Sequence, residues 1–213
     1  MLFIVRHAEC EANVNREWAG AIDSPITVDG IRQSKLLAEW FKKVDLVVTS
    51  PSQRAITVAR MLKTKAMMTT SLLKEMDGGD WEGESLDKIV NTAEYKVFEQ
   101  VLVNCTPPNG ESFEQVLERT RKVALKLDKL YGKSMYGVDT HVIIVSHGVT
   151  IKALAMTLLG DINAIGFLPN TGYVNINSAN RTGDIKVSKT LYDHLKGHEH
   201  LLSTTKIPWT VSK

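Results

Sequence analysis

The sequence has few cysteines, no excess of charge of either sign and no long apolar run. Its 213 residues include only two cysteines, Cys10 and Cys105, which are far apart and have no metal-ligand spacing. This usage is typical of a reducing compartment rather than of a disulfide framework. Lysine and arginine number 26 against 24 acidic residues, so no overall field would attract nucleic acid or an anionic membrane.

No apolar stretch approaches the roughly 20 residues that cross a bilayer, and the first run, LFIV, is too short for the apolar region of a secretory signal. Internal repeats and low-complexity segments are also absent. We therefore expect a soluble, cytoplasmic protein with neither a nucleic acid nor a membrane as its partner. With 43% hydrophobic residues, the chain can bury a substantial core.

Three short apolar runs predict strands of a buried, mainly parallel sheet. They are LFIV at 2–5, DLVVTS at 45–50 and HVIIVSHG at 141–148, and runs without polar alternation suit strands that are covered on both faces. Apolar residues recur at helical spacing after the second and third runs, and 27–43 predicts another helix between the first two. This alternation predicts an α/β fold, a three-layer αβα sandwich.

The middle of the chain has a different pattern. The glycine-containing segments DGGDWEGES and CTPPNGES flank a predicted helix at 86–103. Ser112 and Gln115 form a capping box that predicts the start of a second helix, which Gly132 ends. We therefore predict a helical insertion of about 76–135 that lies over the C-terminal edge of the strands.

The whole chain, 1–213, is expected to form a single domain. Its core is assigned to 1–75 and 136–213, on either side of the insertion.

The pattern of 170–190 predicts a closing β-hairpin, because turn residues separate two β-prone stretches there. The sequence leaves open whether two copies associate as a homodimer.

Polar residues follow the predicted strands at the points where those strands end. Arg6 and His7 follow the first strand, and His147 and Gly148 follow the third. The carboxyl ends of parallel strands share one edge of a sheet, where α/β proteins bind ligands. A lone histidine at a strand end is most often a structural residue. Two histidines together with arginine at one edge favour an anion-binding site instead.

Arg54 adds a cation to this edge. We predict it in the first turn of the helix after the second strand, with Ser50 as the N-cap and Pro51 in the first helical position. A cation there opposes the helix dipole, a conflict that a bound anion would remove. Guanidinium groups match phosphate oxygens bidentately, and they favour the neutral, nucleophilic form of a nearby histidine.

With these residues in place, the sequence resembles the histidine phosphatase superfamily, also called phosphoglycerate mutase-like. VRHAE is similar to the family's RHG-E signature, and Asn13 lies seven positions after the signature arginine, as in that family. Further motifs follow in the family's order along nearly the whole chain: DSPITVDGIRQS, VTSPSQRAITVA, LLKEMDGGDWEG, PNGES and VIIVSHG.

The resemblance implies a phosphohistidine mechanism with catalytic residues His7, Glu75 and His147. His7 would attack phosphorus, and Glu75 would protonate the leaving oxygen and later activate water, with Asp77 as the backup acid. The oxygens of the phosphoryl group would be held by His147 and by further phosphate-binding residues. These are Arg6, Asn13, Arg54 and Gly148, with Arg16 as a weaker candidate.

No metal and no cofactor are implied, because arginine and histidine already supply positive charge. Two positions depart from the family's pattern. Ala8 replaces the usual glycine, so the backbone there should keep a negative φ. Cys10 replaces a threonine, and we interpret it as a small packed residue rather than a redox group.

The function expected from the resemblance is a metal-independent phosphomonoester hydrolase that acts on a small phosphorylated substrate. One alternative is a 2,3-bisphosphoglycerate-dependent phosphoglycerate mutase. In the mutases the glutamate is followed by arginine, histidine and tyrosine, whereas Glu75 is followed by Met76, Asp77 and Gly78, and 76–110 contains no arginine. Another alternative is a non-catalytic phosphohistidine relay or phosphoprotein-binding module, which would not need an acid such as Glu75.

Overall fold

A five-stranded, mostly parallel β-sheet forms the centre of the molecule. The structure, a computed structural model, describes every residue except 101, 133–139, 161–164, 166–167 and 177–213. Its sheet has the strand order β3-β2-β4-β1-β5. The strands are β1 (Leu2–Arg6), β2 (Val44–Thr49), β3 (Thr64–Thr69), β4 (Val142–Ser146) and β5 (Tyr173–Ile176). Only β5 is antiparallel to its neighbour, β1.

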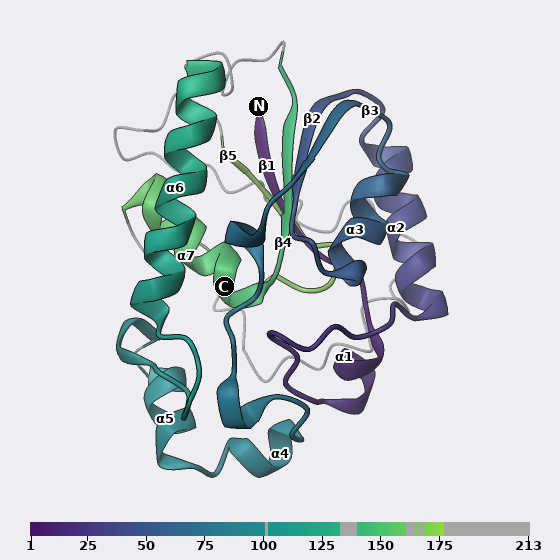
Figure 1. The fold of residues 1–213 in the computed structure, drawn as a ribbon. Coiled ribbons are helices and arrows are strands. Elements are labelled where there is room, and N and C mark those ends of the chain that lie inside the picture. The colour runs from purple at the N-terminus through teal and green to yellow at the C-terminus, as the bar shows by residue number, and fades with distance from the viewer. Residues whose placement is uncertain (101, 133–139, 161–164, 166–167, 177–213) are drawn as a thin grey trace.

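Helices cover both faces of this sheet, as Figure 1 shows. On one face lie α2 (Val28–Trp40) and α3 (Gln53–Met61), and on the other lie α6 (Phe113–Tyr131) and α7 (Gly148–Leu159). Successive side chains of a strand point to opposite faces. In β1, accordingly, Leu2 and Ile4 pack toward α6 and α7, while Phe3 and Val5 pack toward α2 and α3. The predicted three-layer sandwich is confirmed.

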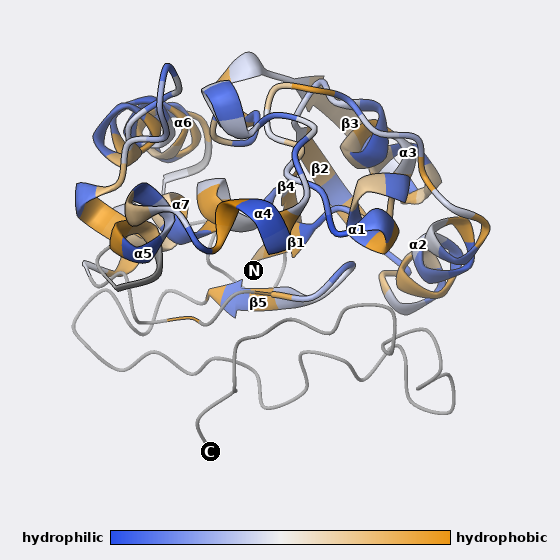
Figure 2. Ribbon diagram, turned by 90° about the horizontal axis from the view of Figure 1, so that it is seen from below, coloured by the Kyte–Doolittle hydropathy of each residue, from blue (hydrophilic) through white to orange (hydrophobic). Residues whose placement is uncertain are grey.

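A third group of short elements lies at the C-terminal ends of the parallel strands. It comprises α1 (Glu11–Asn15), α4 (Leu86–Ile89), α5 (Ala93–Gln100) and the 3₁₀ turns Ser71–Leu73, Gly79–Trp81 and Leu102–Asn104. Figure 2 views this end of the molecule, with α4 and α1 in front of the sheet. Aromatic rings of Trp18, Trp81, Tyr95 and Phe98 pack edge to face or tilted at its centre. The predicted helical cover over this edge is confirmed for α4 and α5, whereas α6, which was predicted in the same insertion, packs on a face of the sheet.

The prediction of one helix at 86–103 is wrong in one respect, because the segment forms two helices, α4 and α5. Thr92 explains the break. Its hydroxyl donates to the Ile89 carbonyl and accepts from the Tyr95 N–H. One side chain thus satisfies the end of the first helix and the start of the second. The capping box of Ser112 and Gln115 is present as predicted.

The edge strand β3 differs from the prediction, and the predicted hairpin is described only in part. Strand β3 was not predicted, because TKAMMT has no apolar run, and its side chains are largely exposed at the sheet edge. Of the predicted hairpin, β5 is present, and 177–190 lies outside the described residues.

The division into core and insertion stays a prediction, although Val123 and Leu127 of α6 pack in the core of the sheet. No described helix has the length and apolar composition that a membrane span requires.

Candidate active site

The parallel pairing of β1 and β4 brings the two predicted histidines together. Arg6 pairs with Ser146 at the last position of the two strands. The next residue, His7, donates its backbone N–H to the Ser146 carbonyl at 2.9 Å. His147 follows directly and forms the N-cap of α7. The two imidazole rings lie 5.0 Å apart between centroids, and both residues are buried.

The tautomer of His7 follows from its single side-chain hydrogen bond. Its Nδ1 lies 2.7 Å from the Ala8 carbonyl oxygen. A carbonyl can only accept, so Nδ1 carries the proton, and the Nε2 of the neutral ring retains its lone pair. The backbone φ of Ala8 is not positive, as predicted for this departure from glycine.

Burial and positive charge keep both rings neutral. Burial lowers the pKa of His7 well below its usual value, the guanidinium groups of Arg54 and Arg6 lower it further, and the Ala8 hydrogen bond opposes them. The pKa of His147 is also lowered, first by burial and then by the charge of Arg54. A neutral His7 with a free Nε2 lone pair is the form that can act as a nucleophile.

The prediction of Ser50 as the N-cap of α3 is wrong. The helix begins at Gln53, and its N-cap is Ser52, whose side chain makes no capping bond. Instead, the carboxylate of Asp23 accepts from the Gln53 N–H at 2.6 Å. A group from a distant loop therefore caps this helix, and Ser50 is available for another contact.

That contact is with His147, whose Nε2 lies 2.8 Å from the Ser50 hydroxyl oxygen. The hydroxyl has one proton, and its other hydroxyl neighbour, Ser52, is farther away at 3.3 Å. Ser50 is therefore best assigned as the donor to Nε2, which leaves the proton of His147 on Nδ1. This Nδ1 is buried and has no hydrogen-bond partner among the described residues.

Arg54 is held by backbone carbonyls rather than by a buried carboxylate. Its side chain is 1% exposed, and its Nη atoms donate to the carbonyls of Ala19, Gly20 and Ile22 at 2.8–3.2 Å. Asp23, which is 40% exposed, adds one ion-pair contact at 3.2 Å. These four contacts occupy the Nη hydrogens, so the terminal fork predicted to grip phosphate is already engaged. The Nε of Arg54 is buried and has no partner among the described residues.

Asn170 links Asn13 to the site. From the sequence, Asn170 could be assigned only to a turn before the last strand, with no defined role. The amide nitrogen of Asn170 donates to Asn13 Oδ1 at 3.0 Å and to the His7 carbonyl at 3.2 Å. Asn13 Oδ1 also accepts from the Cys10 N–H and thiol. Because Asn13 Oδ1 takes all three bonds, the amide nitrogen of Asn13 can point toward a ligand.

Glu75, which is far from His147 in the sequence, lies at the N-terminus of α7, where it contacts Val149 and Thr150 just after His147. One carboxylate oxygen accepts from the Thr150 and Met76 N–H groups, and the other accepts from the Val149 N–H. Three backbone donors thus fix this carboxylate at the helix start, and the Thr150 hydroxyl donates to the Lys74 carbonyl beside it. Asp77 is exposed, and its carboxylate accepts from the Gly79 N–H.

The remaining predicted residues lie in two different environments. Gly148 is buried at the first position of α7, beside His147. Arg16 ends α1 in a left-handed conformation with φ of 58°, and its guanidinium pairs with Asp87 at 2.8 Å on the surface. The structure therefore groups Arg6, His7, Arg54 and His147, with Glu75, Gly148 and Asn13 beside them, and directs Arg16 toward Asp87.

Within this group, the His147 Nδ1–H and the Arg54 Nε–H are buried donors without an acceptor among the described residues. Buried donors are nearly always satisfied, so an anion is the natural partner here. No cluster of histidine, cysteine and acidic residues that could hold a metal occurs in the described part of the chain.

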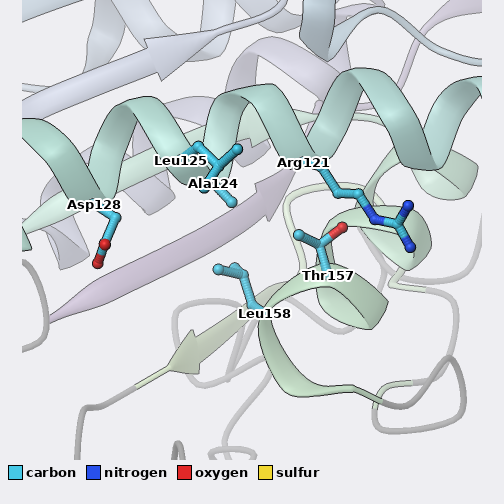
Figure 3. Close-up of a pocket in the computed structure, with 6 residues that line it drawn as sticks. All are labelled: Arg121, Ala124, Leu125, Asp128, Thr157 and Leu158. Carbon is cyan, nitrogen blue, oxygen red and sulfur yellow. The ribbon is translucent and has the colours of Figure 1, made fainter.

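A separate pocket of about 450 Å³ lies between α6 and α7 (Figure 3). It is lined by Arg121, Ala124, Leu125, Asp128, Thr157 and Leu158. It contains none of the strand-end residues, so it is not part of the candidate active site.

Curated proteins similar to this chain include phosphatases and mutases. A Hydrogenobacter thermophilus protein named "Putative phosphoserine phosphatase 2" is 33% identical over 168 residues, which cover 75% of this chain and 78% of the relative. A Klebsiella pneumoniae protein named "Probable phosphoglycerate mutase GpmB" is 28% identical over 168 residues, covering 75% of this chain and 74% of the relative.

Among solved structures, the mycobacterial glucosyl-3-phosphoglycerate phosphatase matches with a TM-score of 0.72 and 25% identity. The match covers 81% of this chain and 87% of that structure. The model of the histidine phosphatase superfamily (branch 1) matches residues 2–191. With this match over most of its length, the chain belongs to the histidine phosphatase superfamily.

Proposed function

We propose that the protein is a metal-independent phosphomonoester hydrolase that works through a phosphohistidine intermediate on small phosphorylated metabolites. The observation that carries this proposal is the state of His7. Its ring is buried and neutral, its Nδ1 proton is fixed on the Ala8 carbonyl, and its Nε2 lone pair lies within the field of Arg54 and Arg6. A nucleophile surrounded by cations suits attack on a phosphate dianion.

In the first step, Nε2 of His7 forms a bond to phosphorus while the ester P–O bond breaks. Glu75 in its protonated form gives its proton to the leaving oxygen. In the second step, water attacks phosphorus, the N–P bond breaks, and the Glu75 carboxylate takes a proton from the water. Arg6, Arg54, His147, Asn13 and the backbone at Gly148 stabilise the charge on the phosphoryl oxygens.

The names of relatives support a small phosphorylated substrate without identifying it. One similar protein is named for phosphoserine and one similar structure for glucosyl-3-phosphoglycerate. Both names describe a phosphate ester of a small polar molecule. The exact substrate depends on the segments around α4 and α5, because they cover the strand ends where it would enter.

The mutase alternative keeps the support of similar proteins that bear that name. A mutase must hold a substrate carboxylate and a second phosphate, which requires additional cations. The segment after Glu75 presents the exposed carboxylate of Asp77 instead, and 76–110 contains no arginine. A non-catalytic phosphate-binding module is disfavoured by the three backbone donors that fix Glu75 at the start of α7, since binding alone needs no oriented carboxylate.

The nucleophile is tested by trapping. Acid-labile, base-stable label from a phosphorylated substrate should appear on the wild type after brief reaction and quenching under conditions that preserve it. His7→Ala should lose both the label and turnover. The matched control is His141→Ala, which removes a histidine at the opposite end of β4 and should retain both. Label on serine or cysteine, or normal turnover by His7→Ala, would show that the mechanism is wrong.

The charge state of His7 is tested by its titration. Burial and two guanidinium groups lower its pKa, so the reactive neutral form should persist at pH 6.5 and be lost only as the pH falls through a lower value. Arg54→Ala removes one of these causes and should raise the pKa of His7 toward 6.5. The measurement is an NMR titration of the ring C–H signals, assigned with His7→Gln. A wild-type pKa at or above 6.5, or no upward change in Arg54→Ala, contradicts this assignment.

The acid is tested with two leaving groups. Glu75→Gln should slow hydrolysis of an alkyl phosphate by ~10²-fold or more, and slow that of p-nitrophenyl phosphate much less, because nitrophenolate leaves without protonation. Asp77→Asn is the control and should affect both substrates equally and weakly. If Asp77→Asn shows the selective loss instead, Asp77 is the acid.

Hydrolase and mutase are distinguished with 3-phosphoglycerate. We expect release of inorganic phosphate to exceed formation of 2-phosphoglycerate, with and without catalytic 2,3-bisphosphoglycerate, because 76–110 contains no arginine to hold a reorienting glycerate. The assay follows both products in one sample. Interconversion that is faster than hydrolysis and stimulated by the bisphosphate would favour the mutase.

A further inference from the structure

Glu82, in the segment after the proposed acid, has an unusual set of hydrogen bonds. Its carboxylate accepts from four backbone N–H groups and from no side chain in the described structure. The donors are Gly20 at 3.1 Å, Ala21 at 2.9 Å, Ile22 at 3.0 Å and Gly78 at 2.7 Å. Three of them are consecutive, so a single anion fixes the conformation of the loop 19–22.

The same loop holds Arg54 from its other side. The carbonyls of Ala19, Gly20 and Ile22 accept from the Arg54 guanidinium at 2.8, 3.2 and 3.0 Å. Two peptide groups therefore connect the two charged residues directly. In the peptide between 19 and 20, and again in the peptide between 20 and 21, the N–H faces Glu82 and the C=O faces Arg54.

This arrangement is electrostatically cooperative. A carboxylate at the N–H end and a guanidinium at the C=O end polarise an amide in the same sense, so each hydrogen bond strengthens the other. The loop also requires a glycine at position 20. A Cβ there would lie 2.0 Å from the Met76 carbonyl oxygen and 2.5 Å from Glu82 Oε1. No side chain fits between the loop and the segment that carries Glu82.

We infer that Glu82 is a positioning residue for Arg54. Through the loop 19–22 it fixes the carbonyls that accept three of the four Nη contacts of Arg54, and thereby sets the orientation of Nε, which has no partner among the described residues. Glu82 touches neither histidine in the described structure. Its effect on phosphate passes through Arg54, and in that respect the inference rests on the proposed function.

A double-mutant cycle tests this coupling. Glu82→Gln keeps the size and removes the charge, and should lower kcat/KM and weaken inhibition by inorganic phosphate by ~10-fold, within the coupling usual for contacting residues. In an Arg54→Ala background the same change should cost less than about twofold. Glu84→Gln is the control, because Glu84 lies two residues away and pairs with Lys88 on the surface. It should have no effect on either quantity.

Additive losses in the cycle, or an unfolding midpoint lowered without any change in kcat/KM and phosphate inhibition, would overturn the inference. If Glu82→Gln does not fold, Glu82→Asp is taken through the same cycle, because it keeps the charge but cannot reach all four donors. Direct calorimetric binding of inorganic phosphate separates the two proposals. If the wild type binds phosphate but does not hydrolyse esters, the proposed function is wrong, and the effect of Glu82→Gln on phosphate binding still tests the role of Glu82. If the wild type binds no phosphate, the proposed function and the role of Glu82 are both wrong.

Discussion

The site depends on burying positive charge at a sheet edge without neutralising it. Arg54 is almost fully buried, yet its Nη contacts are three carbonyls and one partly exposed carboxylate. Arg6 likewise donates to a carbonyl, that of Leu168. A carbonyl satisfies an N–H donor while leaving the net charge in place. The guanidinium field therefore reaches His7 and His147, and both rings stay neutral for this reason as well as through burial.

The covering segments are needed to create this environment. A buried guanidinium requires several fixed hydrogen-bond acceptors. The loop 19–22 supplies three of them, and Glu82 binds the N–H groups on the opposite side of the same loop. The same stretch of chain contains Glu75, whose carboxylate is fixed by the first turn of α7. Residues 75–82 thus connect two features at once: the orientation of the proposed acid, Glu75, and the support of the loop that holds Arg54.

The sequence predicted the parts of the molecule that depend on local pattern. The central strands are continuous apolar runs, so their ends, and with them Arg6, His7 and His147, could be placed at one edge. Strand β3 could not be predicted, because an edge strand with exposed side chains has no apolar run. Ser50 was assigned to the wrong contact, because its partner is 97 residues away and Asp23 caps the helix from another loop. Asn170 contacts Asn13, and Glu82 contacts the loop 19–22, across 60 or more residues of sequence, which no local pattern contains.

The N-terminus of α7 brings together the proposed acid and the histidine proposed to bind phosphate. His147 is the N-cap, Gly148 is the first helical residue, and the next two N–H groups are bound by Glu75. The Glu75 carboxylate therefore occupies the second and third N–H groups of α7, and the Gly148 N–H remains for the proposed phosphate site. The carboxylate is held at the helix start by the backbone N–H groups of Met76, Val149 and Thr150. The position of Glu75 beside the proposed phosphate site is therefore set by the fold. The substrate, in contrast, is proposed to be selected by the segments around α4 and α5 that cover the strand ends.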